Sequence, residues 1–262
     1  MFAKTTMKTA VMFFAATAVS LFLHAKPVSA LTTEVTPRNI PINILYHGAQ
    51  LTIAGESEAN NDLIIRIQTE PREAHMKFKG KAAGLFWMKM GDMSFEHVPA
   101  AYLLFTSKSL ESLLPVDERI KEGIGYESIK EQTVMSSSAE GMDPERWIAE
   151  FIKFKKAEHL YQIQEGSITR PSGAQDSKYQ LDIKWPYKAA PGTYNIEVLA
   201  VRDGKVVDRA ETSLTVERTG IVAKLSDLAF NHAAIYGIIA IVVAMFAGFA
   251  VGALFKKGGG AH

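Results

Sequence analysis

Two long apolar runs stand near the ends of the chain, and between them apolar and polar positions alternate over short distances. The first run, Thr9–Leu23, is uncharged, follows two lysines and is too short to cross a hydrocarbon core of about 30 Å as a helix. The small residues of Val28-Ser29-Ala30 then suit signal peptidase. We therefore predict that residues 1–30 are a signal peptide, with an uncleaved anchor as the alternative, and that the mature chain starts at Leu31.

The second run, Ala233–Phe255, contains no charged residue and as a helix would be about 34 Å long, enough to cross a bilayer. Lys256 and Lys257 follow it directly. By the positive-inside rule these lysines predict a short cytoplasmic tail, residues 256–262. The pattern predicts a single-pass protein of the bacterial inner membrane, with the folded part in the periplasm and the C-terminus in the cytoplasm.

Small residues recur every four positions of this second run, which predicts one stripe along a helix, at Ala240, Ala244, Gly248 and Gly252. Such a stripe lets another helix approach closely, either from a polytopic membrane partner or from a second copy in a homodimer. The alternative is that small residues are simply common in membrane helices. Just before the run, Ile221, Leu225 and Leu228 share helical spacing, so we expect residues 219–232 to form a juxtamembrane helix or linker.

The region 31–218 has the texture of short strands separated by turn-forming residues. Asp203-Gly204, between the alternating runs Tyr194–Arg202 and Lys205–Val216, predicts a tight hairpin. Tyr194, which follows Pro-Gly-Thr, is typical of immunoglobulin-like sandwiches. The further expected strands are Ile42–Tyr46, Ala49–Glu56, Asp62–Thr69, Gly84–Met90 and Ala101–Thr106.

A helical insertion is expected within this region, at about 109–165. Asp143 followed by Pro144 predicts a helix start, and that helix should run to about Leu160. Its apolar face is expected to carry Trp147, Ile148, Phe151, Ile152 and Phe154. A weaker helical pattern covers Val116–Lys130 and is interrupted by Gly123 and Gly125, while Ser136–Gly141 reads as a loop. The predicted fold class is mainly β: an immunoglobulin-like β-sandwich with a helical insertion, plus one C-terminal transmembrane helix.

The charge and cysteine content of the chain exclude several classes of function. The whole chain has a net charge of +1, and without the three lysines of residues 1–30 the balance is 26 − 28 = −2, which argues against nucleic-acid binding. The chain has no cysteine, so thiol chemistry, iron–sulfur clusters and Cys-ligated zinc are excluded. No P-loop, G-x-S-x-G or H-E-x-x-H motif is present, and we expect no catalytic activity and no cofactor.

One cluster of side chains could bind a soft metal. His75 and Met76 precede Met88, Met90, Met93 and His97, and thioether and imidazole groups are ligands for Cu(I). The alternative is that these methionines fill a core, as methionine commonly does.

Several segments resemble a known family: IPINILYHGAQLTIAGE, GLFWMKMGDMSF, PAAYLLFTSKSL, ERWIAEFIKFK and APGTYNIEVLAVRDG, together with the terminal apolar run. The chain resembles the proteobacterial Alph-Pro-TM family of transmembrane proteins, which has no assigned activity. Members of that family are often encoded near sulfite-exporter-type permeases, so the resemblance implies a partner of this type. We therefore expect a membrane-anchored periplasmic interaction module that is accessory to such a permease. The alternative is a periplasmic protein that binds a small ligand or copper.

The orientation can be tested with alkaline phosphatase, which is active only in the periplasm. A fusion after His262 should be inactive, because the tail is expected in the cytoplasm, and the membrane-extracted chain should begin at or near Leu31. An active C-terminal fusion would reverse the predicted topology.

Overall fold

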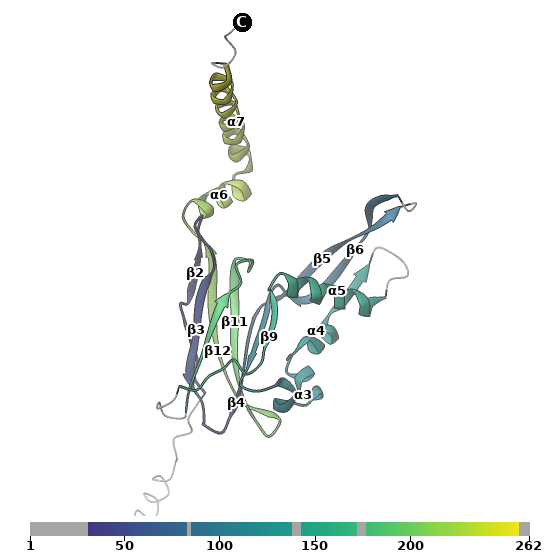
Figure 1. Ribbon diagram of the computed structural model, residues 1–262, viewed down its shortest axis with the longest axis vertical. Coiled ribbons are helices and arrows are strands. Elements are labelled where there is room, and N and C mark those ends of the chain that lie inside the picture. Colours follow the sequence, from purple (N-terminus) through teal and green to yellow (C-terminus); the bar gives the residue numbers. More distant parts are fainter. Residues whose placement is uncertain (1–30, 83–84, 138–142, 172–176, 257–262) are drawn as a thin grey trace, which may run out of the picture.

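The computed structural model describes residues 31–82, 85–137, 143–171 and 177–256. The chain is mainly β, with several sheets and one C-terminal apolar helix, as the sequence predicted (Figure 1). The predicted signal peptide and, apart from Lys256, the predicted tail lie outside the described residues.

Two sheets pack face to face. The smaller sheet has the order β1-β3-β10 and contains β1 (Glu34–Thr36), β3 (Ala49–Glu56) and β10 (Lys178–Trp185). The larger has the order β2-β12-β11-β4-β7-β9 and contains β2 (Asn39–Ile42), β12 (Lys205–Arg218), β11 (Gly192–Arg202), β4 (Asp62–Thr69), β7 (Tyr102–Thr106) and β9 (Tyr161–Gln164). The order β12-β11-β4 is that of strands G, F and C in immunoglobulin domains, although the finer immunoglobulin-like assignment stays a prediction.

The β11–β12 hairpin is confirmed. Arg202 pairs with Lys205, and both central residues of the turn, Asp203 and Gly204, have positive φ, as a tight primed turn requires. The alternation along this strand predicts that Tyr194, Ile196, Val198 and Ala200 face a core, and all four are fully buried in the first core, which the two sheets share. The hydroxyl of Tyr194 donates a hydrogen bond of 2.7 Å to the carbonyl of Ala190, and its ring meets Trp185 edge-on at 4.8 Å.

The larger sheet is buried on both faces. Successive side chains on a strand point to opposite sides, so Leu63 and Ile65 enter the first core while Ile64, between them, enters a second core. Leu104 on β7 and Leu199 on β11 face the same second core. The sheet therefore needs a cover on its outer face, and the insertion supplies it.

In the described residues, the insertion contains a third sheet and four helices. The sheet has the order β5-β6-β8, with β5 (Pro71–Ala82), β6 (Phe86–Pro99) and β8 (Val134–Ser137), and the helices are α2 (Leu110–Leu113), α3 (Val116–Lys121), α4 (Tyr126–Gln132) and α5 (Pro144–Ala157). The insertion is larger than predicted because it also includes β5 and β6. Asp143 caps α5 by accepting a hydrogen bond of 3.1 Å from the amide of Glu145. Phe151 of α5 stacks on Phe95 of β6 at 4.5 Å, which holds the helix against the third sheet.

The structure corrects several boundaries. The predicted strand Gly84–Met90 starts outside the described residues, and its part from Phe86 onward belongs to the long β5–β6 hairpin outside the sandwich. There β5 and β6 pair with each other, and β6 also pairs with β8. The predicted strand Ile42–Tyr46 ends at Ile42, where the side chain of Asn43 accepts a hydrogen bond from the amide of Leu45 and turns the chain.

The insertion also differs in detail from its prediction. The helical pattern Val116–Lys130 is split into α3 and α4, since Gly123 and Gly125 both have positive φ. Phe154 was expected on the buried face of α5 but is exposed. β8 extends through Ser137 into the expected loop Ser136–Gly141, whose remaining residues lie outside the described ranges.

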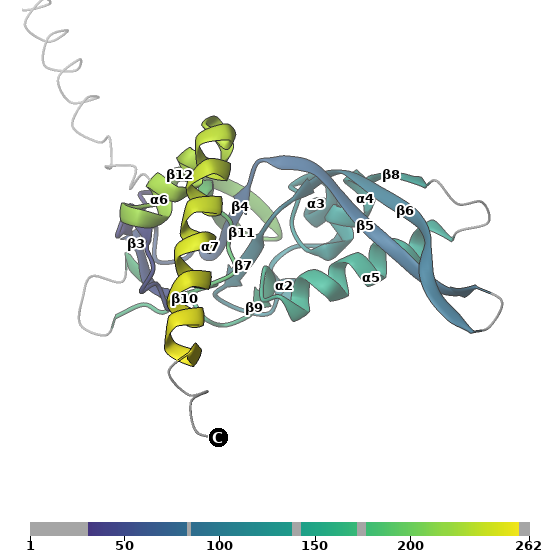
Figure 2. The same cartoon turned by 90° about the horizontal axis from the view of Figure 1, so that it is seen from above.

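Single residues join the last three elements. Thr219 separates β12 from α6 (Gly220–Asn231), and His232 separates α6 from α7 (Ala233–Lys256) (Figures 1 and 2). The stretch Ala233–Ala253 of α7 is long and apolar enough to cross a membrane and is not buried by the described chain.

Close backbone packing in β3 gives a stability prediction. A Cβ added at Gly55 would lie 2.0 Å from the carbonyl oxygen of Thr32, and backbone cannot yield as a flexible side chain can. Gly55→Ala should therefore lower the free energy of unfolding by about 1–3 kcal/mol, or more, in urea titrations followed by circular dichroism. Ala54→Ser, on the next residue, is the control and should change it little. Equal stability of the two variants would contradict the packing described.

Candidate functional site

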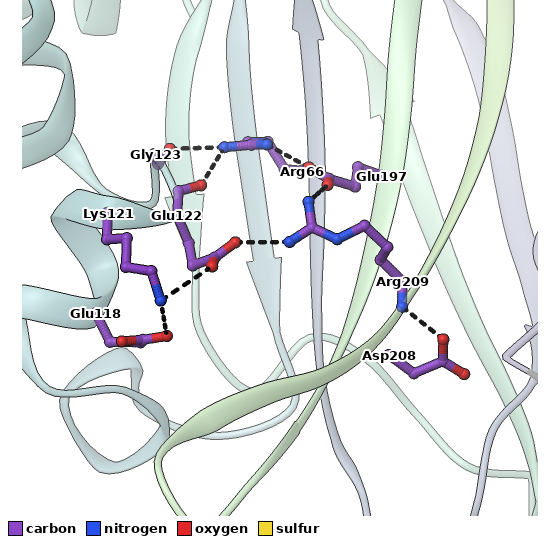
Figure 3. A network of polar contacts seen from close by, with 8 residues as sticks. All are labelled: Arg66, Glu118, Lys121, Glu122, Gly123, Glu197, Asp208 and Arg209. Atoms are coloured by element: carbon purple, nitrogen blue, oxygen red, sulfur yellow. Dashed lines mark hydrogen bonds and ion pairs between the residues drawn. The ribbon is translucent and has the colours of Figure 1, made fainter.

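Arg66 stands at the centre of the outer face of the larger sheet, directly opposite Glu197 on the neighbouring strand. One nitrogen of its guanidinium, Nη2, pairs with the carboxylate of Glu197. The other, Nη1, donates hydrogen bonds to the carbonyl oxygens of Glu122 at 2.7 Å and Gly123 at 2.9 Å (Figure 3). One strand residue thus connects the sheet with the α3–α4 loop of the insertion.

Arg209 of β12 completes this network from the solvent side. Its Nη1 lies 2.9 Å from Oε1 of Glu197 and its Nη2 lies 2.8 Å from Oε2 of Glu122 (Figure 3). The side chains of Arg66 and Glu197 are only 14% and 10% exposed, whereas that of Arg209 is 50% exposed. The inner pair is therefore shielded from water, and removing one of its two charges would leave the other buried and unpaired, which is costly. The contacts of Arg209 are weaker because solvent screens them.

The carbonyl groups of the α3–α4 loop can approach Arg66 because residue 123 is a glycine. A Cβ at that position would lie 2.6 Å from Nη1 of Arg66. The hydroxyl of Tyr102 donates to the carbonyl of Gly123 at 3.3 Å and accepts from the amide of Gly125 at 2.8 Å. Burial raises the pKa of Tyr102 to about 12, so this hydroxyl keeps its proton at neutral pH.

A second contact holds the far part of the insertion. The hydroxyl of Tyr161 donates to the carbonyl of Pro99 at 2.7 Å. Lys155 donates to the carbonyl of Ala100 at 3.1 Å and lies 5.5 Å from the ring centroid of Phe151. Burial lowers the pKa of Lys155, and the negative charge of Glu158 partly offsets this shift. This cluster attaches α5 to the edge of the larger sheet.

Beside the ion-pair network lies a polar groove of about 560 Å³ on the outer face of β4, β11 and β12. Its walls include Arg66, Gln68, Asn195, Glu197 and Arg209, and hydroxyl-bearing residues of β12 continue them. Amide, hydroxyl and paired charged groups can bind an extended polar segment through hydrogen bonds. Such a segment need not carry a net charge. We call this surface the outer groove.

The structure spreads the predicted metal ligands along the β5–β6 hairpin. Met93 is buried in the second core, and its cross-strand partner Met76 packs against that core. Met88 is exposed and lies five residues away, about 17 Å along the strand. The exposed His97 lies beyond Met93 on its other side, and the side chain of Met90 is outside what is described. Met88 and Met93 are thus not brought together.

His75 bonds to Ser94 through Nδ1 at 2.8 Å. Within the described ranges, no three His, Asp or Glu side chains are grouped as metal ligands. The copper interpretation therefore stays a prediction, without a geometric site to support it.

The predicted small-residue stripe lies on α7. Ala240, Ala244, Gly248 and Gly252 are all exposed, and a Cβ at Gly248 or Gly252 would meet no described atom within 4 Å. The stripe is therefore open to another helix.

Sequence reasoning missed the ion-pair network. The available signal was Arg66 inside the apolar run of β4 and Glu197 inside that of β11. A charged side chain within a strand that is otherwise buried on both faces needs a partner of opposite charge. That partner can be identified only when the pairing of β4 with β11 is known.

A family comparison completes this description. Residues 30–257 match the family described as "Putative transmembrane protein (Alph_Pro_TM)". The chain belongs to this family. The match confirms the resemblance drawn from the sequence and supports a membrane location for the Alph_Pro_TM chain, with α7 as its apolar helix. No curated protein and no solved structure matches the chain.

The network predicts a large effect of Arg66→Met. The change removes a donor from the carbonyl of Glu122 and from part of the Glu197 carboxylate, and it leaves the carbonyl of Gly123 with only the bond from Tyr102. We therefore expect a loss of about 3 kcal/mol in the free energy of unfolding. Hydrogen exchange should accelerate first in α4, whose approach to the sheet depends on Arg66.

Arg38→Met is the matched control. It removes an ion pair with Glu34 in which both side chains are 71% exposed, and should cost less than about 1 kcal/mol. Similar small losses in both variants would show that the network does not hold the insertion.

Proposed function

We propose that this protein is a non-catalytic interaction module, anchored in the bacterial inner membrane by α7, with its folded domain in the periplasm and its C-terminus in the cytoplasm. In this proposal it binds a polytopic membrane protein through α7 and through the periplasmic domain. The resemblance noted from the sequence makes a sulfite-exporter-type permease the first partner to test.

The observation that carries the proposal is the direct connection between the domain and the membrane helix. Only Thr219 and His232 separate the last strand, α6 and α7. The amide of Thr219 donates to the carbonyl of Ile42 at 2.9 Å, and Arg218 reaches Ser226 of α6 at 3.3 Å. A domain tied this closely stays within its own length of the membrane surface, where other membrane proteins are within its reach.

The outer groove supports a protein partner. Ser213 in its wall is five residues before Arg218, the last residue of β12, about 17 Å along the strand. Short periplasmic loops of a membrane protein can reach this height, and an extended loop can use the hydrogen-bonding groups of the groove. Meanwhile the exposed stripe of α7 offers close contact to a helix of the same partner.

Replacing both glycines of the stripe tests this proposal. Gly248→Leu with Gly252→Leu should leave membrane insertion unchanged, because leucine favours the membrane, but should hold a partner helix away. The expected result is a clear loss of the membrane proteins that co-purify with the tagged chain from mild detergent, measured by quantitative mass spectrometry at matched expression.

Ala250→Leu with Ala253→Leu is the matched control, because these small residues lie on the opposite side of α7 at 100° per residue. This pair should retain the partners. Retention of every partner and of any homodimer by the glycine variant would show that α7 serves only as an anchor.

A further inference from the structure

The far end of the β5–β6 hairpin exposes large apolar side chains. Leu85 and Phe86 are 75% and 73% exposed, and Met88 is 51% exposed. Together with Lys79 and Lys89 we call these residues the hairpin tip. Contiguous apolar patches on the surface of a protein commonly mark sites that bind another protein or a membrane.

The described structure gives this end of the hairpin little support. β8 pairs with β6 only from Met93 to Glu96, so beyond Met93 the hairpin is a ribbon of two strands. Phe86 lies seven residues further, about 23 Å from the second core. A two-stranded ribbon is only marginally stable in water by itself, so another surface would stabilise it.

The charges of the ribbon indicate the chemistry of that surface. Residues 77–89 contain four lysines and no acidic residue. Lys79 and Lys89 are direct cross-strand partners and both are exposed, an arrangement that is unfavourable for like charges. Asp92 pairs with Lys89 and compensates one of the two charges. A surface that carries negative charge and has an apolar interior beneath it would match both the lysines and the exposed apolar side chains of the tip.

The direction of the hairpin places such a surface nearby. In Figure 1 the hairpin leaves the sandwich upward, on the side from which α7 rises, and its end reaches about the level of α6. In Figure 2, seen from above, α7 runs toward the lower edge, and the hairpin runs to the right and partly toward the lower edge. The two views agree that the hairpin rises on the side of the domain from which α7 rises, and that it also extends sideways away from α7.

We propose that the hairpin tip binds the lipid surface of the membrane in which α7 is anchored. Leu85, Phe86 and Met88 enter the boundary between headgroups and acyl chains, and Lys79 and Lys89 contact anionic headgroups. The inference requires α7 to cross the bilayer but does not depend on any protein partner.

The chain has no cysteine, so one introduced cysteine can carry a fluorophore at a chosen depth. The full chain with Leu85→Cys, labelled with an environment-sensitive dye, would be placed in nanodiscs with one copy per disc. The discs would contain either phosphatidylglycerol mixed with phosphatidylcholine or phosphatidylcholine alone. Quenching by lipids with spin labels on their acyl chains reports contact with the bilayer, and quenching by acrylamide reports contact with water.

We expect the dye at position 85 to be quenched by the labelled lipids and protected from acrylamide in phosphatidylglycerol discs. In these discs Lys79→Gln and Lys89→Gln should each reduce the ratio of docked to undocked tip about fivefold, the equivalent of about 1 kcal/mol for a lysine near an anionic surface. Lys205→Gln should have no effect, since Lys205 begins β12 at the end away from α6.

Two reference labels make the result decisive. A dye at Val207→Cys, at the same far end of β12, should be quenched only by acrylamide, and a dye at Ile241→Cys in α7 should be quenched by the lipids and so confirm insertion. The proposal is overturned if position 85 behaves like position 207 while position 241 is inserted. It is also overturned if position 85 is exposed to water in these single-copy discs but protected in a second preparation with two copies per disc, which would indicate self-association. Neither result would affect the proposed protein partner.

Discussion

The charge of Arg66 imposes the constraint on which the arrangement of this domain depends. A guanidinium on a largely buried sheet face must be paired and hydrogen-bonded, because an unpaired charge there would be very costly. Glu197 supplies the opposite charge from the next strand, and the carbonyl groups of Glu122 and Gly123 supply two further acceptors. The α3–α4 loop must therefore reach the sheet, and glycine must stand at position 123.

The same constraint joins the sandwich and the insertion into one body. The larger sheet separates two cores, and the second core exists only when the insertion covers it. The hairpin that belongs to the insertion begins one residue after β4 and ends shortly before β7, both central to this sheet. Contacts such as Phe95 on Phe151 then fix its base. The direction of the hairpin therefore follows from how the insertion docks.

Local signals in the sequence were read correctly and non-local pairings were not. Asp203-Gly204, Asp143-Pro144 and the pair Gly123 and Gly125 each control the backbone over a few residues, so their turn, cap and helix break could be predicted. The placement of Phe86–Pro99 outside the sandwich could not, because a strand has the same alternation in either sheet. The Arg66 network was missed for a related reason: its partners come from 56 to 131 residues away in the chain.

A single membrane helix fixes the height of an attached domain but leaves it free to rotate about the helix and to tilt. In the proposed arrangement the hairpin tip adds a second contact, at a distance from α7 that the docked insertion sets (Figure 2). Two separate contacts suppress tilting, so the outer groove would stay at one height above the bilayer. A partner loop then meets a surface that is already oriented, which reduces the entropy lost on binding. In this arrangement the orientation of the domain on the membrane depends on Arg66, because the Arg66 network holds the insertion, and with it the hairpin, in a fixed position on the sandwich.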